Sequence, residues 1–226
     1  MHKPLSTGAT IGILGGGQLG RMLSVAAARL GFRSHIFEPG IGCPASHVAD
    51  QLTTASYTDT DALQRFAETV DVITYEFENI PTSALDVLEQ VATIRPGREA
   101  LRISQDRLTE KDFLNSLGLK TAPYAAIDDA PALGAALNAF GTAAILKTRR
   151  FGYDGKGQVR LQPDSDPQAA VADLAGQAAL LEGFVDFSHE VSVIGARGAD
   201  GAVCCFDPGE NVHSNGILRT TTLPAR

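Results

Sequence analysis

The chain has 226 residues, 44% hydrophobic and 20% charged, which is the composition of an ordinary globular protein of one or two domains. Its formal net charge of −7 excludes a nonspecific nucleic-acid binder, because such a protein needs a basic face. The 23 glycines, together with 6% aromatic residues and no tryptophan, favour α/β layers over an aromatic-rich β-sandwich.

Neither a membrane span nor a secretory signal is expected. No apolar run reaches the roughly 18 residues that a transmembrane helix needs, and the first residues lack an apolar signal core. The three cysteines are Cys43, Cys204 and Cys205, an odd number with two adjacent, so they do not form a disulfide framework. We expect reduced thiols, a cytoplasmic location and no membrane partner.

The first hundred residues alternate between strands and helices. In chain order, we expect a strand over 10–14, a helix over 19–30, a strand over 34–38, a helix over 58–69, a strand over 70–75 and a helix over 83–91. This βαβ rhythm predicts a parallel sheet that is covered by helices on both faces.

The pattern changes near Gln105 to helices mixed with antiparallel strands. We expect helices over 106–117, 132–140 and 167–174, and strands over 124–127, 143–147, 158–161 and 179–182. Two alternating runs, 190–196 and 202–206, flank a Gly-Ala-Asp-Gly turn and predict a hairpin. We therefore expect one domain over 1–105 and a second over 106–226.

A glycine loop follows the first predicted strand. Gly15, Gly17 and Gly20 satisfy G-x-G-x-x-G before a helix, where backbone N–H groups and the helix dipole can bind phosphate. Glu38 ends the next strand, where a dinucleotide site has its ribose-binding acid. The loop leaves three readings open: NAD(P) or FAD, the phosphate of a substrate, or a tight turn without a ligand.

A second glycine loop gives a sharper signal. An apolar strand ends at Lys147, and the loop that follows contains Gly152, Gly155 and Gly157. Such a loop can fold over a triphosphate, and the lysine supplies a flexible positive charge for phosphate oxygens. It is not a Walker A loop, which needs G-x-x-x-x-G-K-[ST] before a helix. The plain alternative is a solvated basic hairpin.

The stretch from Lys147 to Gln158 resembles the lid loop of ATP-grasp ligases. Its Gly-Tyr-Asp-Gly-Lys-Gly-Gln sequence is similar to one branch of them, the 5-(carboxyamino)imidazole ribonucleotide synthases. Further stretches resemble that family in the same order along nearly the whole chain: Gly-Gly-Gly-Gln-Leu-Gly-Arg-Met at 15–22, Thr-Tyr-Glu-Phe-Glu-Asn-Ile-Pro at 74–81, Gln-Asp-Arg-Leu-Thr-Glu-Lys at 105–111, Glu-Val-Ser at 190–192 and Asn-Val-His-Ser-Asn-Gly-Ile-Leu at 211–218.

This resemblance implies a fold and a reaction. The fold is a Rossmann-like pre-ATP-grasp domain followed by an incomplete α+β ATP-grasp domain, with a lid subdomain over about 122–185 and the start of a second subdomain over 186–226. The reaction is ATP-dependent carboxylation of 5-aminoimidazole ribonucleotide with bicarbonate, through carboxyphosphate, in purine biosynthesis. The partners are these small molecules, and the family suggests a homodimer.

The resemblance also implies the nucleotide site. It places ATP against Arg107, Lys147, Gly152, Tyr153, Asp154, Gly155, Lys156, Gly157, Gln158, Glu182, Gly183, Phe184, Val185, Glu190 and His213. Within this set, Glu182 and Val185 flank the adenine, and Glu190 holds the ribose hydroxyls. For each position the alternative is a residue without a role in nucleotide binding; Glu190, for example, could be an ordinary exposed strand residue.

The carboxylation site is implied in the same way. Tyr153, Asp154 and Lys156 are the expected catalytic residues, and Asp154 orients the amine or accepts its proton, unless it only shapes the turn. Gly17, Gln18 and Leu19 offer backbone N–H groups to the ribonucleotide phosphate. Glu76, at the end of a parallel strand, binds the ribose hydroxyls.

One departure from the family concerns magnesium. ATP-grasp ligases bind Mg²⁺ through acidic residues late in the fold, and we expect those ligands beyond Arg226. The chain would then be a fragment without full activity. Three other functions stay open: an ATP-grasp ligase with a different acceptor, a nicotinamide or flavin oxidoreductase, and a non-catalytic remnant that binds a nucleotide.

Overall fold

The computed structural model describes residues 4–152, 157–174, 176–214 and 217–226. The chain divides into two compact units, the N-terminal unit Lys3–Thr109 and the C-terminal unit, which contains Glu110–Arg226. The boundary expected near residue 105 lies a few residues before this division. Within the described ranges, no helix is both long and apolar enough to cross a membrane.

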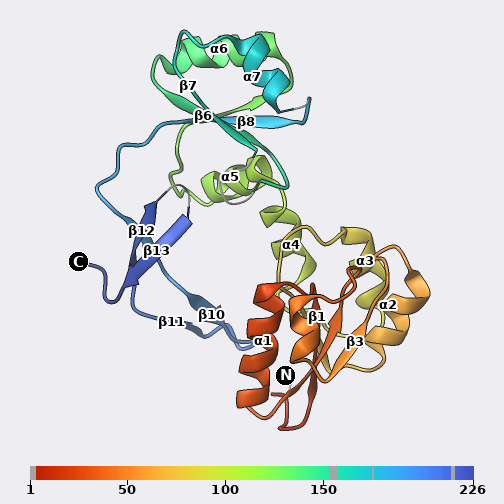
Figure 1. Ribbon diagram of the computed structural model, residues 1–226. Coiled ribbons are helices and arrows are strands. Elements are labelled where there is room, and N and C mark those ends of the chain that lie inside the picture. The colour runs from red at the N-terminus through yellow and green to blue at the C-terminus, as the bar shows by residue number, and fades with distance from the viewer. Residues whose placement is uncertain (1–3, 153–156, 175, 215–216) are drawn as a thin grey trace. The chain divides into compact units, whose positions relative to one another are not determined.

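The N-terminal unit is built on a parallel sheet (Figure 1). Its elements are β1 (Thr10–Leu14), α1 (Gln18–Arg29), β2 (Arg33–Phe37), η1 (Pro44–His47), β3 (Gln51–Thr53), α2 (Thr60–Ala67), β4 (Val72–Tyr75), α3 (Thr82–Leu88), α4 (Arg98–Ser104) and the start of α5 (Arg107–Ser116). The four strands lie in the order β3-β2-β1-β4, and all pair in parallel. The predicted parallel sheet is confirmed, whereas the short β3, η1 and α4 were not predicted.

Both faces of this sheet are apolar. On one face, Leu14 and Phe37 pack in a cluster with Phe66 of α2 and residues of α3. On the other face, the neighbouring residues Ile13 and Ile36 pack with the segment around η1. Adjacent residues of β1 and β2 therefore enter different clusters, as expected for a sheet with period 2 that is covered on both sides.

Helix α1 packs through its small residues. Gly20, Ser24 and Ala27 are buried, whereas the large apolar residues Met22 and Leu30 are exposed. A Cβ atom at Gly20 would lie 2.5 Å from the carbonyl oxygen of Gly15, so the helix and the loop can approach this closely only with glycine. The helix is where the sequence predicts it, but helical spacing of large apolar residues does not identify its buried face.

The described part of the C-terminal unit contains antiparallel strands, most of α5 and the helices α6 and α7. Its elements after α5 are β5 (Tyr124–Ile127), α6 (Ala130–Phe140), β6 (Ala144–Thr148), β7 (Gln158–Leu161), α7 (Pro167–Asp173), β8 (Ala179–Gly183), β9 (Glu190–Ser192), β10 (Gly195–Arg197), β11 (Val203–Cys205), β12 (Gly209–Ser214) and β13 (Ile217–Thr222). The expected fold class, an α/β domain followed by an α+β domain, is confirmed.

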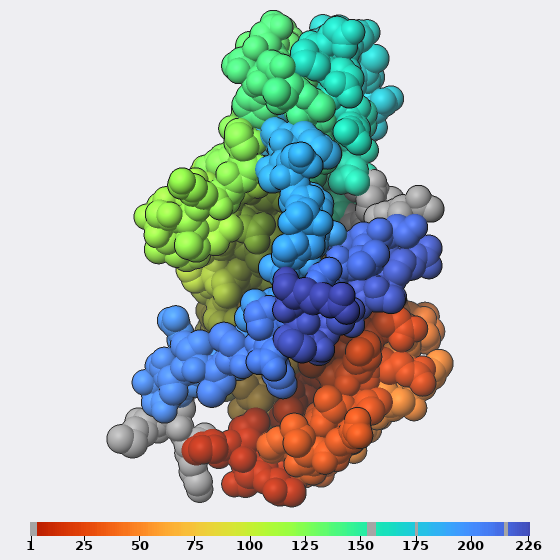
Figure 2. Space-filling view, turned by 90° about the vertical axis from the view of Figure 1, so that its left-hand side faces the viewer, coloured from red at the N-terminus to blue at the C-terminus, as the bar shows by residue number. Residues whose placement is uncertain are grey.

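A four-stranded sheet in the order β5-β8-β6-β7 forms the first part of this unit, and we call it the lid sheet. Helices α6 and α7 lie over one of its faces (Figure 1). Their atoms adjoin at the top of the view in Figure 2. Leu146 and Leu181 join the apolar cluster under these helices. Because strand residues alternate, Lys147 and Glu182, their sequence neighbours, lie on the opposite face. That face positions the candidate site.

The later strands correct one prediction. The run 190–196 is not a single strand: β9 pairs with β12 in a three-stranded sheet in the order β13-β12-β9, whereas β10 pairs with β11 as a hairpin. The predicted hairpin is therefore confirmed for β10 and β11 alone. Alternating hydrophobicity indicates an extended chain, but it does not say where that chain changes its pairing partner.

Candidate functional site

The first glycine loop is held by two glutamates. The backbone N–H of Gly16 donates to Oε2 of Glu38 at 2.8 Å, and that of Gly17 donates to Oε1 of Glu76 at 3.0 Å. Gly17 is the N-cap residue of α1, and Glu76 directly follows β4. Two loop amides at the start of the helix are therefore already bound to carboxylates from the ends of neighbouring strands.

Glu38 has a structural role that the sequence did not reveal. Its second oxygen, Oε1, accepts the N–H of Gly40 at 2.9 Å, so both oxygens are engaged with backbone. In a dinucleotide site, this carboxylate would instead face the ribose. A Cβ atom at Gly16 would lie 2.4 Å from Sγ of the buried Cys43, which also explains why glycine stands there. The first loop thus does not have the arrangement of a nicotinamide site.

Glu76 is half-buried beside this loop. Burial raises its pKa above the usual value; the N–H of Gly17 opposes the shift, and the charges of Glu38 and Glu78 add to it. The hydroxyl of Tyr57 is similarly affected, since burial and the charges of Glu38 and Glu76 raise its pKa. A neutral ligand hydroxyl is a suitable partner for such a carboxylate, because it can donate a hydrogen bond.

The structure brings together the residues expected for the ribonucleotide. Gln18 and Leu19 are the first two residues of α1, and Gly17 and Glu76 are joined by the hydrogen bond described above. The amide of Gly17 is engaged by Glu76, which the sequence did not predict. A phosphate at this helix end therefore either displaces Glu76 from Gly17 or uses the amides of Gln18 and Leu19.

A second charged cluster lies on the face of the lid sheet that α6 and α7 leave uncovered. Nζ of Lys147 lies 2.6 Å from Oε2 of Glu182, and Nζ of Lys111 lies 3.1 Å from Oε1 of the same carboxylate. The side chains of Lys111, Glu182 and Lys147 are only 15%, 13% and 23% exposed. Two ammonium groups therefore share one carboxylate in a largely desolvated place.

These cations keep Glu182 ionised. Burial alone would raise the pKa of its carboxyl, but the hydrogen bond and charge of Lys147, joined by those of Lys111, outweigh burial and lower it. Lys111 was missed as a functional residue at the sequence level. The available signal was its spacing: Lys111 follows Arg107 by four residues on α5, so both cations lie on one side of the helix.

The lid loop is anchored at its second end. Gly157 has a φ of +67°, and its carbonyl accepts the N–H of Thr148 at 2.8 Å. A Cβ atom at Gly157 would lie 2.7 Å from Oγ1 of Thr148, so glycine is required there. Gln158 pairs with Lys147 between β6 and β7. The predicted catalytic residues Tyr153, Asp154 and Lys156, and also Gly155, lie outside the described residues.

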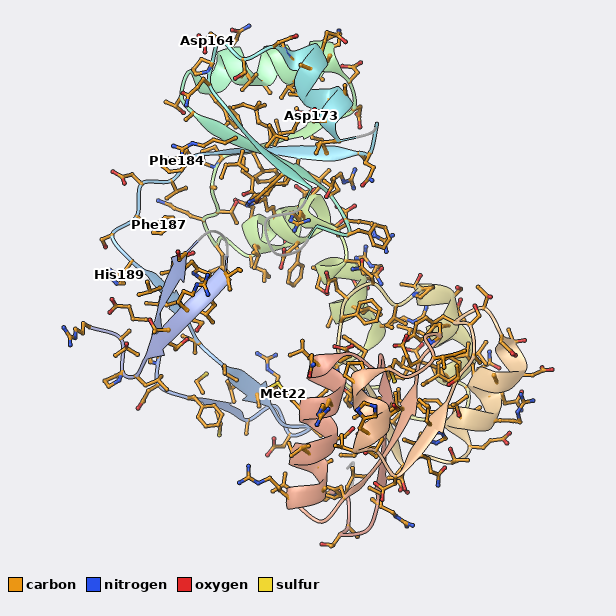
Figure 3. The ribbon with its side chains drawn as sticks, viewed as in Figure 1. Met22, Asp164, Asp173, Phe184, Phe187 and His189 are labelled. Carbon is orange, nitrogen blue, oxygen red and sulfur yellow. The ribbon has the colours of Figure 1, made fainter. Side chains whose placement is uncertain are left out.

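The predicted adenine segment leaves the lid sheet at the end of β8. Gly183 donates its N–H to the carbonyl of Pro123, and Phe184 donates to that of Ala143. The Arg160 guanidinium lies 4.6 Å from the centre of the Phe184 ring. Figure 3 shows Phe184, Phe187 and His189 along the extended chain between β8 and β9. Val185 is 46% exposed, and its backbone is part of this extended chain.

Glu190 and His213 also come together. They lie on the paired strands β9 and β12, and Nδ1 of His213 is 2.7 Å from Oε2 of Glu190. Arg107 is the first residue of α5 and belongs to the N-terminal unit. Among the residues that the structure describes, no group of three or more His, Cys, Asp or Glu could hold a metal ion, so we assign no residue to Mg²⁺.

Comparison with known proteins agrees with this architecture. Residues 8–105 match the ribonucleotide synthetase preATP-grasp domain, and residues 112–226 match the ATP-grasp domain. The N5-carboxyaminoimidazole ribonucleotide synthase of Brucella melitensis is 56% identical over 223 residues, which cover 98% of this chain and 62% of the relative. The chain thus spans about three fifths of the length of the N5-carboxyaminoimidazole ribonucleotide synthases it matches.

Solved structures agree as well. An ADP complex of N5-carboxyaminoimidazole ribonucleotide synthetase superposes with a TM-score of 0.93 at 40% identity, over 100% of this chain and 60% of that one. The Aspergillus clavatus synthase with ADP and 5-aminoimidazole ribonucleotide gives 0.85 at 26% identity, over 97% and 58%. Since the ATP-grasp model matches half of the residues and the structural likeness spans all of them, the chain belongs to the ATP-grasp family.

Proposed function

We propose that the protein carboxylates 5-aminoimidazole ribonucleotide with bicarbonate and ATP, as a 5-(carboxyamino)imidazole ribonucleotide synthase of purine biosynthesis. The observation that carries this proposal is the pairing of Lys147 with Glu182 on the face of the lid sheet opposite α6 and α7, at the base of the glycine loop. The likeness to synthetase structures that hold ADP supports nucleotide binding by this chain.

The chemistry needs activation of bicarbonate, which is a poor electrophile. Attack of a bicarbonate oxygen on the γ-phosphorus of ATP forms carboxyphosphate and releases ADP. Carboxyphosphate then delivers CO₂ to the exocyclic amine, releasing phosphate, and the amine loses one proton as the N–C bond forms. The protein has to position three substrates, neutralise phosphate charge and keep water from the intermediate.

The nucleotide residues divide this work. Lys147 binds phosphate oxygens, and the glycine loop that follows it covers them. Glu182 and Val185 flank the adenine edge with their backbone groups. Glu190 holds the ribose hydroxyls, and His213, whose Nδ1 lies 2.7 Å from Oε2 of Glu190, is a further nucleotide contact. Arg107 supplies a further positive charge for the phosphates of ATP.

The acceptor residues have separate tasks. Gln18 and Leu19, with Gly17, bind the ribonucleotide phosphate, and Glu76 accepts hydrogen bonds from its ribose hydroxyls. Asp154 orients the amine or takes its proton, with Tyr153 and Lys156 beside it in the lid loop.

Three wider features belong to the same proposal: a cytoplasmic location, a homodimer, and ATP used as its magnesium complex. None of the described residues is assigned as a magnesium ligand, and no step above depends on one.

The test is release of phosphate from Mg-ATP and bicarbonate by the complete gene product, with and without 5-aminoimidazole ribonucleotide. We expect strong stimulation by the ribonucleotide and its loss in Lys147→Ala, while Lys120→Ala, an exposed lysine after α5, keeps wild-type turnover. Turnover that is indifferent to the ribonucleotide would contradict the acceptor and leave an ATP-grasp ligase with another substrate.

A further inference from the structure

Glu182 divides its two oxygens between two lysines. Oε2 faces Lys147 and Oε1 faces Lys111, at 2.6 and 3.1 Å. Glu182 pairs with Ile145 across β8 and β6, so Lys147, two residues further along β6, lies on the same face of the sheet. Lys111 comes from α5 instead. One carboxylate thus links a sheet cation to a helix cation.

The second lysine is unexpected for a site that only has to bind phosphate. Lys147 alone would balance the charge of Glu182. With Lys111 added, the cluster has one more positive than negative charge, in a place where no side chain is more than 23% exposed. At such low exposure water screens charges weakly, so the surplus positive charge interacts strongly with its neighbours and with any bound anion.

Phosphate binding by Lys147 creates a conflict at Glu182. An ammonium group that turns to phosphate oxygens leaves Glu182 or weakens its bond to it. A desolvated carboxylate without a cation is costly, because its lost hydration is no longer compensated. The pKa of Glu182 is lowered by the lysines against the effect of burial, so this carboxylate is ionised at neutral pH and needs a positive partner.

We propose that Lys111 is a positioning residue that holds the charge of Glu182 while Lys147 binds the phosphates of the nucleotide. This inference rests on the proposed function, since it requires ATP or ADP at this face. Lys111 itself does not touch the phosphate. It makes Lys147 available, because Glu182 keeps one ammonium partner throughout.

The surroundings of Lys111 hold it in this place. Nζ of Lys111 lies 5.7 Å from the centre of the Tyr124 ring, and Tyr124 pairs with Glu182 across β5 and β8. The Tyr124 hydroxyl donates to Oδ1 of Asp112 at 2.7 Å, which ties the next residue of α5 to the same strand. Lys111 therefore approaches Glu182 from a fixed helix and not from a free loop.

The central test compares ADP with adenosine by calorimetric titration of the complete gene product. In Lys111→Met, Lys147 is the remaining cation of Glu182 in this cluster and is withheld from phosphate. We expect ADP affinity to fall by about tenfold, equivalent to about 1.4 kcal/mol, and adenosine affinity to stay within about twofold. Lys111→Arg restores ADP binding, and Lys120→Met controls for the loss of one positive charge.

A double-mutant cycle separates an indirect role from direct contact. If Lys111 acts by freeing Lys147, then Lys111→Met has no further effect on ADP affinity in a Lys147→Met background. An undiminished effect in that background means that Lys111 acts on the phosphate without Lys147, and it overturns the inference.

The remaining outcomes are equally decisive. Equal losses of affinity for ADP and adenosine would indicate that Lys111 only anchors α5. Unchanged ADP affinity would indicate that Glu182 does not hold Lys147 back. Either result overturns this inference and leaves the proposed function standing. A wild-type protein that does not bind ADP overturns the proposed function together with this inference. Melting temperatures of all variants identify any loss that comes from unfolding.

Discussion

Carboxylates in this chain bind to backbone or to lysine before any ligand arrives. Glu38 and Glu76 hold amides of the first glycine loop, and Glu182 holds Lys147 and Lys111. Each of these groups has a preformed partner, so a ligand has to exchange for an existing contact. When a ligand group replaces the existing partner, the half-buried carboxylate keeps a hydrogen bond. An unpaired charge in such a place would cost free energy.

The raised pKa of Glu76 has a measurable effect on stability. A carboxyl that binds its proton more tightly in the folded state stabilises the fold at low pH. This contribution is lost as pH rises from the pKa of the unfolded state, about 4.3, through the pKa of the folded state. In Glu76→Gln, which can still accept the Gly17 N–H, the melting temperature relative to wild type should therefore increase from pH 4 to pH 8.

The control for this comparison is Glu68→Gln, which removes the charge of an exposed glutamate after α2. The difference in melting temperature between Glu68→Gln and wild type should change less across the same pH range. A Glu76→Gln protein that loses stability relative to wild type as pH rises would contradict the assigned direction. Thermal unfolding at pH 4, 6 and 8 provides the measurement.

At the level of the secondary-structure elements, the proposed function depends on which side chains each face of the lid sheet carries. The lid sheet buries Leu146 and Leu181 under α6 and α7 and keeps Lys147 and Glu182 on its other side. The helices act as the support for this charged face. Their own stability therefore affects the site without any contact to a ligand.

The cap of α6 tests this support. Oδ1 of Asp129 accepts the N–H of Ala132 at 2.8 Å at the start of the helix. Asp129→Ala should lower the free energy of unfolding by about 1 kcal/mol, because the N–H of Ala132 loses its partner. Asp129→Asn should keep most of the wild-type stability, because its side-chain oxygen can still accept this N–H. Denaturant unfolding measures both. Asp128→Ala, at the neighbouring exposed position, should stay close to wild type, and an equal loss there would contradict the cap.

For the molecule as a whole, each of the three apolar clusters lies within one of the two units. The clusters around Phe66 and around Ile36 draw on the N-terminal unit, and the cluster around Leu146 draws on the C-terminal unit. None of these three clusters combines residues from both units. The N-terminal unit therefore has its own core, which is the property of an independently folding domain.

We expect residues 3–109, expressed alone, to unfold in one cooperative transition. Phe66 is 1% exposed in the centre of that core, so Phe66→Ala should remove about 3–5 kcal/mol and shift the urea midpoint strongly. Circular dichroism during urea unfolding makes the measurement. A broad transition that Phe66→Ala leaves unchanged would mean that this unit needs the rest of the protein to fold.

The local features could be predicted from the amino-acid sequence: the parallel βαβ order of the first hundred residues, both glycine loops, and the family to which their combination belongs. These follow from period, turn chemistry and motif order, which are properties of neighbouring residues. Four other features became visible in the folded chain: α1 packs through its small residues, the run 190–196 divides between two sheets, Glu38 binds the N–H of Gly16, and Lys111 contacts Glu182. Each of these depends on contacts between segments far apart in the chain, and such contacts leave no periodic signal in a single sequence.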